Sequence, residues 1–461
     1  MSILAAFMVP HPPMIIPDIG KGEERKIQKT IDAYEQVSKE VAELKPEVII
    51  ISSPHSIMYA DYFHISPGRK AVGSFRRFNA SNVSFEEEYD TELRDKICEY
   101  AKNDDFPAGI LGERDPELDH GTLVPLYFIS KRYKDAKIIR IGLSGLDLCD
   151  HYRMGMYIKK ALEELDRKAV YIASGDLSHK LQEYGPYGYS KEGPEYDERI
   201  MDVCSRAAFD ELFDFSEDFL DKAAECGHRS FVMMAGAFDG ISVKATKLSH
   251  EDITGVGYGI CTFYPEEKDE DRCFLKKYQK KKEKELQERN ENSDCYVRLA
   301  RKAVEYFVIN RRHLDVTEDV DQELLDRKAG AFVSIHKNGR LRGCIGTILP
   351  TRKNLALEII GNAVSACSRD PRFTPITADE LKDLEISVDV LGEIEDIESK
   401  DMLDVKRYGV IVSCGDRRGL LLPDLDGVDT VDEQIEIARE KGGIRPDDDY
   451  KLSRFEVVRH Y

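Results

Sequence analysis

The sequence predicts an α/β protein with two domains: a layered α/β/α N-terminal domain around a buried sheet and a smaller α+β C-terminal domain. Three observations support this prediction. The chain of 461 residues is longer than one ordinary domain. Its first half alternates short runs rich in Ile and Val with amphipathic helical stretches. A strongly charged segment then separates that half from a region of different pattern.

The N-terminal half contains apolar runs that alternate with helical patterns. Continuous Ile and Val runs are typical of strands buried on both faces, as in a parallel sheet covered by helices. We expect strands at residues 3–9, 47–52, 137–142 and 169–174 and helices at residues 27–44 and 152–165. The Gly and aromatic pattern of residues 255–264 could close the sheet.

The charged segment covers residues 266–293 and contains almost no side chain that could fill a core. Such a composition is typical of a linker or of a solvated helix. The sequence therefore predicts a first domain at residues 1–265, a charged linker at 266–293 and a second domain at 294–461.

The C-terminal region mixes strands and helices. Residues 330–335 and 341–346 flank Lys337-Asn338-Gly339, which is a hairpin turn signal. Helical spacing predicts helices at residues 295–307 and 355–367. Further apolar runs lie at residues 384–391, 409–413 and 419–423. This order favours a compact α+β domain.

Composition excludes several classes of function. Hydrophobic residues make up 41% and charged residues 33% of the chain, as in soluble globular proteins. The formal net charge of −20 argues against nucleic acid or an anionic membrane as a partner. No stretch approaches the roughly 20 apolar residues of a membrane span, and the N-terminus lacks a basic leader. We expect a cytoplasmic protein.

The ten cysteines are scattered, and none are paired at the two-residue spacing that zinc ribbons and many iron–sulfur sites use. In a large cytosolic chain most cysteines are reduced and buried. We therefore do not expect this chain alone to hold an iron–sulfur cluster.

Three histidines follow predicted strands directly. His11, His55 and His179 each lie just past the C-terminal end of an apolar run. In α/β sheets this edge is where functional sites are assembled. Three imidazoles far apart in the sequence are therefore predicted to converge, whereas we expect His64, His151 and His250 at the surface and His228 as a bystander.

Imidazole binds divalent iron, zinc and copper well, and a carboxylate completes a three-ligand face that leaves positions open for substrate. Glu225 is the candidate carboxylate, and Cys226 is the soft-ligand alternative. His120 follows Asp119, and His179 lies close to Asp176. Because a neighbouring carboxylate tunes an imidazole, His120 and His179 are candidates for proton transfer as well as for metal binding.

Four motifs resemble, in order, the LigB-type class III extradiol dioxygenase superfamily over residues 1–265. They are Pro-His-Pro-Pro at His11, Ser-Pro-His at His55, Asp-His-Gly-Thr at His120 and Ser-Gly-Asp-Leu-Ser-His at His179. The resemblance implies that His11 and His55 are ligands of Fe(II), His179 the catalytic acid/base and His120 a substrate contact. The family's glutamate ligand falls on Glu225; in the related Memo family a cysteine before glycine takes that place, which points to Cys226. Zinc and copper remain open as the metal.

The run Leu341-Arg342-Gly343-Cys344-Ile345-Gly346-Thr347 resembles the signature of the AMMECR family, over residues 294–461. Gly343 and Gly346 would let the backbone approach a ligand or partner closely. Arg342 could pair with a carboxylate or phosphate. Alternatively, the two glycines have only a structural role in the strand and Cys344 packs in the core.

Together the two domains resemble the AmmeMemoRadiSam system, which is named for co-occurring AMMECR-like, Memo-like and radical SAM proteins. Two functions follow as hypotheses. In the first, the protein is an iron-dependent oxidoreductase of the extradiol type acting on a small molecule. In the second, it is a metal-binding component that works with a separate radical SAM protein, without dioxygenase activity. A scaffold whose metal site has decayed is the third alternative.

Overall fold

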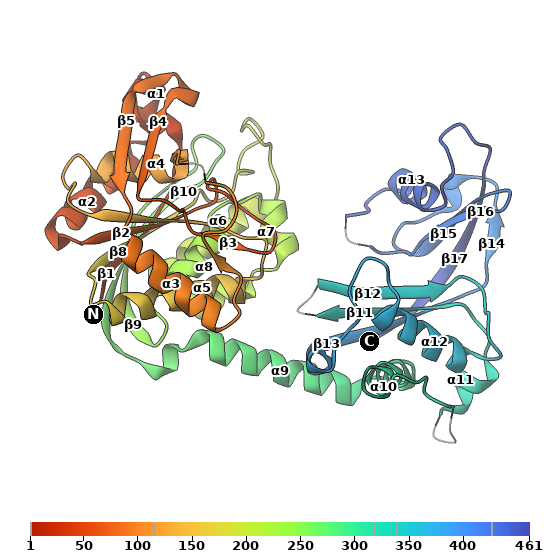
Figure 1. The fold of residues 1–461 in the computed structure, drawn as a ribbon. Helices are drawn as coiled ribbons and strands as arrows, with labels where there is room; N and C mark the ends of the chain where they lie inside the picture. Colours follow the sequence, from red (N-terminus) through yellow and green to blue (C-terminus); the bar gives the residue numbers. More distant parts are fainter. Residues whose placement is uncertain (1, 115, 317–319, 338–339, 426) are drawn as a thin grey trace. The chain divides into compact units, whose positions relative to one another are not determined.

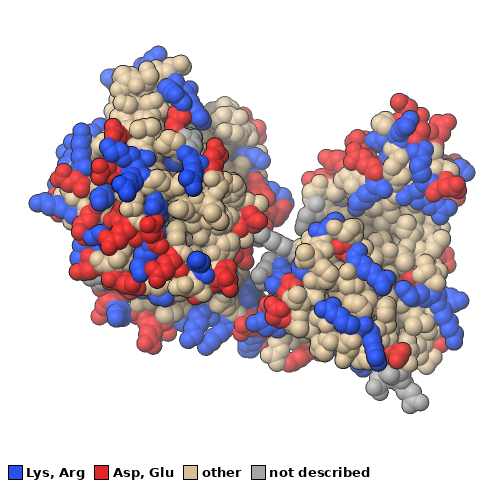
Figure 2. Space-filling model, viewed as in Figure 1, with Lys and Arg blue, Asp and Glu red and all other residues tan. Residues whose placement is uncertain are grey.

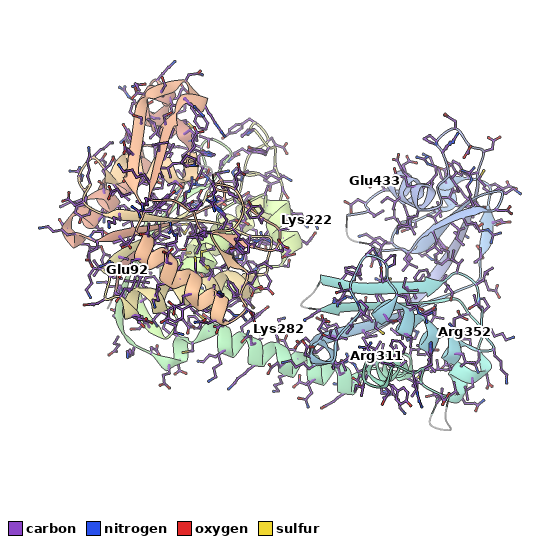
Figure 3. All side chains as sticks on the ribbon, in the orientation of Figure 1. Glu92, Lys222, Lys282, Arg311, Arg352 and Glu433 are labelled. Atoms are coloured by element: carbon purple, nitrogen blue, oxygen red, sulfur yellow. The ribbon has the colours of Figure 1, made fainter. Side chains whose placement is uncertain are left out.

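The computed structural model describes residues 2–114, 116–316, 320–337, 340–425 and 427–461. The chain divides into two compact units, Met1–Gln279 and Lys280–Tyr461 (Figure 1). The division falls inside helix α9 (Phe274–Asn292), within the charged segment. Lys282 lies on this helix and pairs with Glu285 at 3.2 Å (Figure 3).

The N-terminal unit alternates strands and helices, as its sequence pattern predicts. Its strands are β1 (Ile3–Val9), β2 (Val48–Ser53), β3 (Phe63–His64), β4 (Lys70–Phe75), β5 (Ala80–Glu88), β6 (Ala108–Gly109), β7 (Lys137–Gly142), β8 (Ala169–Ser174), β9 (Ile241–Glu251) and β10 (Tyr258–Lys268). Its helices before α9 are α1 (Pro17–Gly20), α2 (Gln28–Leu44), α3 (Thr91–Asn103), α4 (His120–Ile129), α5 (Leu148–Glu164), α6 (Glu192–Arg206), α7 (Glu217–Ala223) and α8 (His228–Gly236).

Six of these strands form one sheet in the order β7-β2-β8-β1-β10-β9. Strands β7, β2, β8 and β1 are parallel, whereas β10 and β9 are antiparallel. Because β2, β8 and β1 are parallel neighbours, their carboxyl ends meet at one edge. This is the edge at which α/β proteins assemble their sites.

Alternate residues of each central strand point into two separate cores. Ala6 and Met8 of β1 face the core that α3, α5, α6 and α8 cover. Ala5 and Phe7 face the opposite core, under α2 and α4. One helical layer covers each face of the buried sheet, which gives the predicted α/β/α arrangement. The predicted fold class is confirmed.

A separate antiparallel hairpin, β4–β5, projects beyond this sheet (Figure 1). A short 3-10 turn, η3 (Arg76–Phe78), joins its two strands. Val72 on the hairpin bridges to Glu117, just before α4. The hairpin was not expected from the sequence, because β5 carries charged and polar residues at most positions.

The C-terminal unit is a curled antiparallel sheet with helices. Its strands are β11 (Ala331–Lys337), β12 (Arg340–Thr347), β13 (Leu384–Leu391), β14 (Glu395–Ile397), β15 (Tyr408–Cys414), β16 (Arg417–Leu421) and β17 (Lys451–His460). Its helices after α9 are α10 (Cys295–Asn310), α11 (Gln322–Asp326), α12 (Leu355–Ser368) and α13 (Val431–Lys441). The main path of the sheet runs β12-β11-β13-β17-β15-β16.

Two apolar clusters lie in this unit. Helices α10 and α12 cover β11 and β13 around Ala331 and Val388. Helix α13 covers β15 and β16 around Val410. Strands β11 and β12 pair antiparallel as predicted; Asn338 and Gly339 of the expected turn lie outside the described residues.

Acidic and basic side chains are interspersed over the visible face of the N-terminal unit (Figure 2). Within the described ranges, no helix combines the length and the apolar character that crossing a membrane requires. All ten cysteines are free of disulfides.

Candidate metal centre

His11 follows β1 and its side chain is only 1% exposed. Its Nδ1 lies 2.9 Å from the hydroxyl of Ser174, at the end of β8. That hydroxyl donates its one proton to the carbonyl of Gly121 at 2.6 Å. Ser174 must therefore accept a hydrogen bond from His11 Nδ1, which leaves the lone pair of Nε2 free to bind a cation.

The free Nε2 of His11 faces two other ligand-type side chains. It lies 3.7 Å from Sγ of Cys226, and the His11 and His55 ring centroids are 4.7 Å apart. One ligand atom of each of His11, His55 and Cys226 lies within 4.8 Å of the others. The ends of β1 and β2 and the loop before α8 therefore converge at one point.

This spacing fits a single metal ion. Imidazole nitrogen and thiolate sulfur bind ions at about 2.0–2.3 Å, which places the donors of one ion roughly 3–4.5 Å apart. A spread of up to 4.8 Å needs only a small inward movement of the side chains. Two imidazoles and one thiolate suit zinc, copper or iron.

Cys226, and not Glu225, lies beside the two imidazoles. The carboxylate of Glu225 accepts a hydrogen bond from the backbone N–H of His228 at 2.5 Å, at the first turn of α8. It thus satisfies an otherwise unpaired helix donor. Ala224, at φ 52°, reverses the chain immediately before this pair. The sequence left two candidates for the third ligand. The thiol of Cys226 is the one that lies close to both imidazoles.

The surroundings of Cys226 keep its thiol neutral unless a cation is bound. Its Sγ accepts the backbone N–H of Asp176 at 3.3 Å. Burial raises the pKa of the Cys226 thiol well above its usual range, and the nearby charges of Asp176 and Glu225 add to this. A bound metal ion reverses that balance, because it stabilises the thiolate directly.

His11 and His55 both favour the neutral form that can bind a metal ion. Burial lowers the pKa of His11 well below its usual range, and the charge of His55 acts in the same direction. Burial also lowers the pKa of His55. Because only neutral imidazole coordinates a cation, protons do not compete strongly at neutral pH.

His120 begins α4 and stacks on His55 with ring centroids 4.0 Å apart. Asp119 caps this helix by accepting the backbone N–H of Thr122 at 3.1 Å and also accepts the hydroxyl of Ser53 at 2.5 Å. Burial, with the charges of His55 and His11, lowers the pKa of His120 to about 3. His120 is therefore a neutral hydrogen-bonding group beside the cluster.

His179 lies on the same edge, in the loop after β8. Its Nδ1 contacts the carbonyl oxygen of Ala224, which can only accept, so Nδ1 carries the proton. Nε2 is then free as a base. Tyr187 packs edge-on against the ring at 5.2 Å. His179 lies near enough to His11 and His55 for its charge to lower the pKa of both.

Two functional contacts were missed in the sequence. Asp176 was interpreted as the partner of His179, but its Oδ1 accepts the backbone N–H of His11 at 2.7 Å. For Ser174, which fixes the tautomer of His11, the sequence pattern predicts only the end of a strand. Their position at the end of β8, beside the end of β1, is the signal that could have identified them.

The expectation that His64 and His151 lie at the surface is wrong, since both are fully buried. His64 Nε2 contacts the carbonyl of Glu113 at 2.9 Å, and His151 Nδ1 contacts that of Asp147 at 2.9 Å. His250 is partly exposed and pairs with Asp197 at 2.7 Å. His228, the expected bystander, is buried against the carbonyl of Leu212.

A cavity of about 330 Å³ opens beside the cluster. His55 and His120 form part of its wall, together with Ser56, Arg77, Phe78 and Arg140. It connects the β4–β5 turn to the start of α4, and it is large enough for a small molecule.

In the C-terminal unit, Arg342 of the signature is bound internally. Its guanidinium forms a two-pronged pair with Glu380, at 3.0 and 3.1 Å, and donates to the carbonyl of Thr374 at 2.7 Å. This side chain ties β12 to the segment before β13. The carboxylate partner expected for Arg342 therefore belongs to its own domain.

The two signature glycines are required by packing. A Cβ on Gly343 would lie 2.3 Å from the carbonyl oxygen of Ala366 in α12, and one on Gly346 would lie 2.1 Å from the ring of Phe332. Cys344 accepts the hydroxyl of Ser334 at 3.2 Å, and burial raises the pKa of its thiol. These contacts favour the structural alternative for Gly343, Cys344 and Gly346.

Replacing Glu380 with glutamine should lower the free energy of unfolding at neutral pH by about 2 kcal/mol, which is the usual contribution of a hydrogen bond to a charged group. Burial raises the pKa of Glu380, but Arg342, Thr377 and Lys337 lower it to about 2 overall. The ordinary value is about 4.3. The carboxylate therefore stabilises the fold above about pH 4.3, and this contribution is lost as the pH falls towards 2.

Urea denaturation of the full chain, followed by far-ultraviolet circular dichroism, measures this difference. The gap between wild type and Glu380→Gln should shrink from pH 7 to pH 3. Glu393→Gln, at an exposed position, is the matched control and should show no gap. A gap that is the same at both pH values would contradict the assigned role of the carboxylate.

Comparisons with known proteins agree with this architecture. The family described as the catalytic LigB subunit of aromatic ring-opening dioxygenase matches residues 5–261, and the AMMECR1 family matches residues 297–460. The two-domain resemblance seen in the sequence is confirmed.

Individual relatives cover the chain to different extents. A Clostridium acetobutylicum protein is 42% identical over all of this chain and 99% of its own length. A Thermotoga maritima protein is 52% identical over 36% of this chain and 96% of its own length. The crystal structure of an uncharacterized protein from Pyrococcus horikoshii is 32% identical, covers 37% of this chain and 91% of its own, and has a TM-score of 0.34.

Proposed function

The chain belongs to the LigB family and carries an AMMECR1 domain after its LigB domain, and from this premise we propose that its N-terminal domain is a mononuclear metal enzyme of the extradiol dioxygenase type. The convergence of His11 and His55, at the ends of two parallel strands, with Cys226, in the loop before α8, is the observation that supports this proposal. Its substrate is a small molecule that enters the adjacent cavity.

His11, His55 and Cys226 would hold the ion, with Fe(II) as the first candidate and zinc or copper as alternatives that the thiol also suits. Bound Fe(II) would supply open coordination positions for an aromatic diol and for dioxygen. Asp176 and Ser174 hold His11 in place through its backbone and its ring. Such supporting contacts are typical of metal ligands.

His179 is the proposed acid/base. Because the Ala224 carbonyl fixes the proton on Nδ1, Nε2 can take a proton from a substrate hydroxyl and later return it. His120, neutral at physiological pH, can donate or accept a hydrogen bond in the cavity without adding charge. Phe78 and Leu123 give the wall of this cavity apolar surface.

Replacing His179 with alanine should leave metal content unchanged and lower turnover by roughly 100-fold or more, the usual contribution of a positioned acid/base. Metal analysis and a substrate assay on the same preparation separate the two properties. Joint loss of metal and activity would instead assign His179 to metal binding.

The proposed activity is tested with aerobic, iron-loaded protein and a panel of catechols and aminophenols. Ring opening should produce the absorbance of a conjugated ring-opened product, and dioxygen consumption should match it. If the panel is left untouched, the dioxygenase proposal fails even when the metal is bound.

A second candidate is a metal-binding component of an assembly with a separate radical SAM protein. Two observations favour it: Cys226 takes the place of a carboxylate ligand, and an AMMECR1 domain follows the metal-site domain. Co-purification of a radical SAM protein with the tagged full chain would support it. Full turnover by the isolated chain, with no such partner, would reject it.

A further inference from the structure

The cavity beside His55 and His120 has the walls of a slot for one flat ring. Ile57, Leu118 and Leu123 provide apolar surface. Phe78 stands edge-on to the His120 ring, with centroids 5.5 Å apart at 68°. A volume of about 330 Å³ is at the low end for small-molecule sites, so it suits a single ring better than a large cofactor.

Two arginines, Arg77 and Arg140, line this cavity together with the carboxylates of Glu117 and Asp119, and one of the arginines is already used by the fold. Arg140 is 2% exposed. It donates to the hydroxyl of Ser66 and to the carbonyl of Glu117, each at 2.6 Å, and lies 3.8 Å from Asp119. Arg140 therefore holds the strand edge together.

Arg77 is in a different position. Its nearest carboxylate oxygen, on Glu117, is 4.0 Å away, and Arg76 occupies that same oxygen at 2.7 Å. Within the described part of the chain, the Arg77 guanidinium makes no hydrogen bond. Because Arg76 neutralises Glu117, the charge of Arg77 is available to a ligand, and its planar fork matches a carboxylate.

A third polar group in the cavity wall lacks a partner. The hydroxyl oxygen of Ser56 is buried and, among the described residues, has no hydrogen-bond partner. A buried polar atom left without a partner costs free energy, and a bound ligand is one way to satisfy it. Ser56 lies next to His55, at the metal end of the slot.

We propose that this cavity selects a small, flat organic acid and that Arg77 is the residue that determines this specificity. The acid group pairs with the Arg77 guanidinium, the ring lies between Phe78 and the apolar wall, and the Ser56 hydroxyl bonds to a polar group of the ligand. The inference rests on the proposed function, since it places the substrate beside the metal ligands.

Calorimetric titration of the metal-loaded full chain with benzoate and with benzamide, its uncharged analogue, tests the proposal. Benzoate should bind at least tenfold more tightly than benzamide. Arg77→Ala should abolish this preference, whereas Arg69→Ala, at an exposed position just before β4 on the same hairpin, should retain it. Both positions are exposed, so neither substitution should disturb folding.

Two results would overturn the proposal: equal affinity for benzoate and benzamide, or a preference that survives in Arg77→Ala, which would place the carboxylate on the metal. The same titrations on His11→Ala separate this inference from the proposed function. A preference that persists without metal supports the role of Arg77 even if no ring opening is found.

Discussion

Replacing His11 with alanine should reduce bound metal from about one equivalent per chain to less than about a tenth, since three-ligand sites depend on every ligand. The imidazole is buried and Ser174 fixes its tautomer, so the substitution removes a donor atom, Nε2, that is already oriented toward the other two candidate ligands. Elemental analysis of anaerobically purified protein measures the loss.

Two further variants make the His11 result specific. Ser174→Ala should keep the ligand but weaken metal affinity by roughly 10- to 100-fold, the usual effect of removing a contact that orients a ligand. His313→Ala, at an exposed position in the C-terminal unit, should retain full metal content. Wild-type protein that contains no metal after anaerobic purification with Fe(II) would favour the decayed scaffold instead.

Much of the candidate site follows from strand order. Apolar runs predicted β1, β7 and β8 with the bounds that the structure shows, because buried parallel strands leave a continuous apolar signal. Since β2, β8 and β1 are neighbours, the histidines that follow them had to share an edge. Local sequence therefore predicts this convergence once the strands are parallel.

The parts that could not be predicted depend on side-chain direction in irregular segments. Glu225 and Cys226 are adjacent, and only the reversal at Ala224 and the start of α8 decide which one faces His11. The burial of His64 depends on contacts with Glu113, 49 positions away. The polar β5 strand carries no apolar run that would mark the hairpin bearing Arg77.

The third ligand is tested by a matched pair of substitutions at neighbouring positions. Cys226→Ala should lose metal as completely as His11→Ala, because it removes a donor 3.7 Å from Nε2. Glu225→Gln should keep the metal and instead destabilise the first turn of α8, since the neutral amide accepts the His228 N–H less strongly than the carboxylate does. Because burial raises the pKa of Glu225 to about 7, this difference should be measured at a pH above 7.

Cobalt(II) makes the same distinction visible, because cobalt bound to a thiolate shows an intense charge-transfer absorption that an imidazole and carboxylate site lacks. Wild type and Glu225→Gln should both show the band, and Cys226→Ser should lose it. The reverse pattern, with metal lost in Glu225→Gln and retained in Cys226→Ala, would restore the carboxylate ligand. It would require the loop before α8 to turn over when metal binds, because the carboxylate would have to leave the helix donor that it now satisfies.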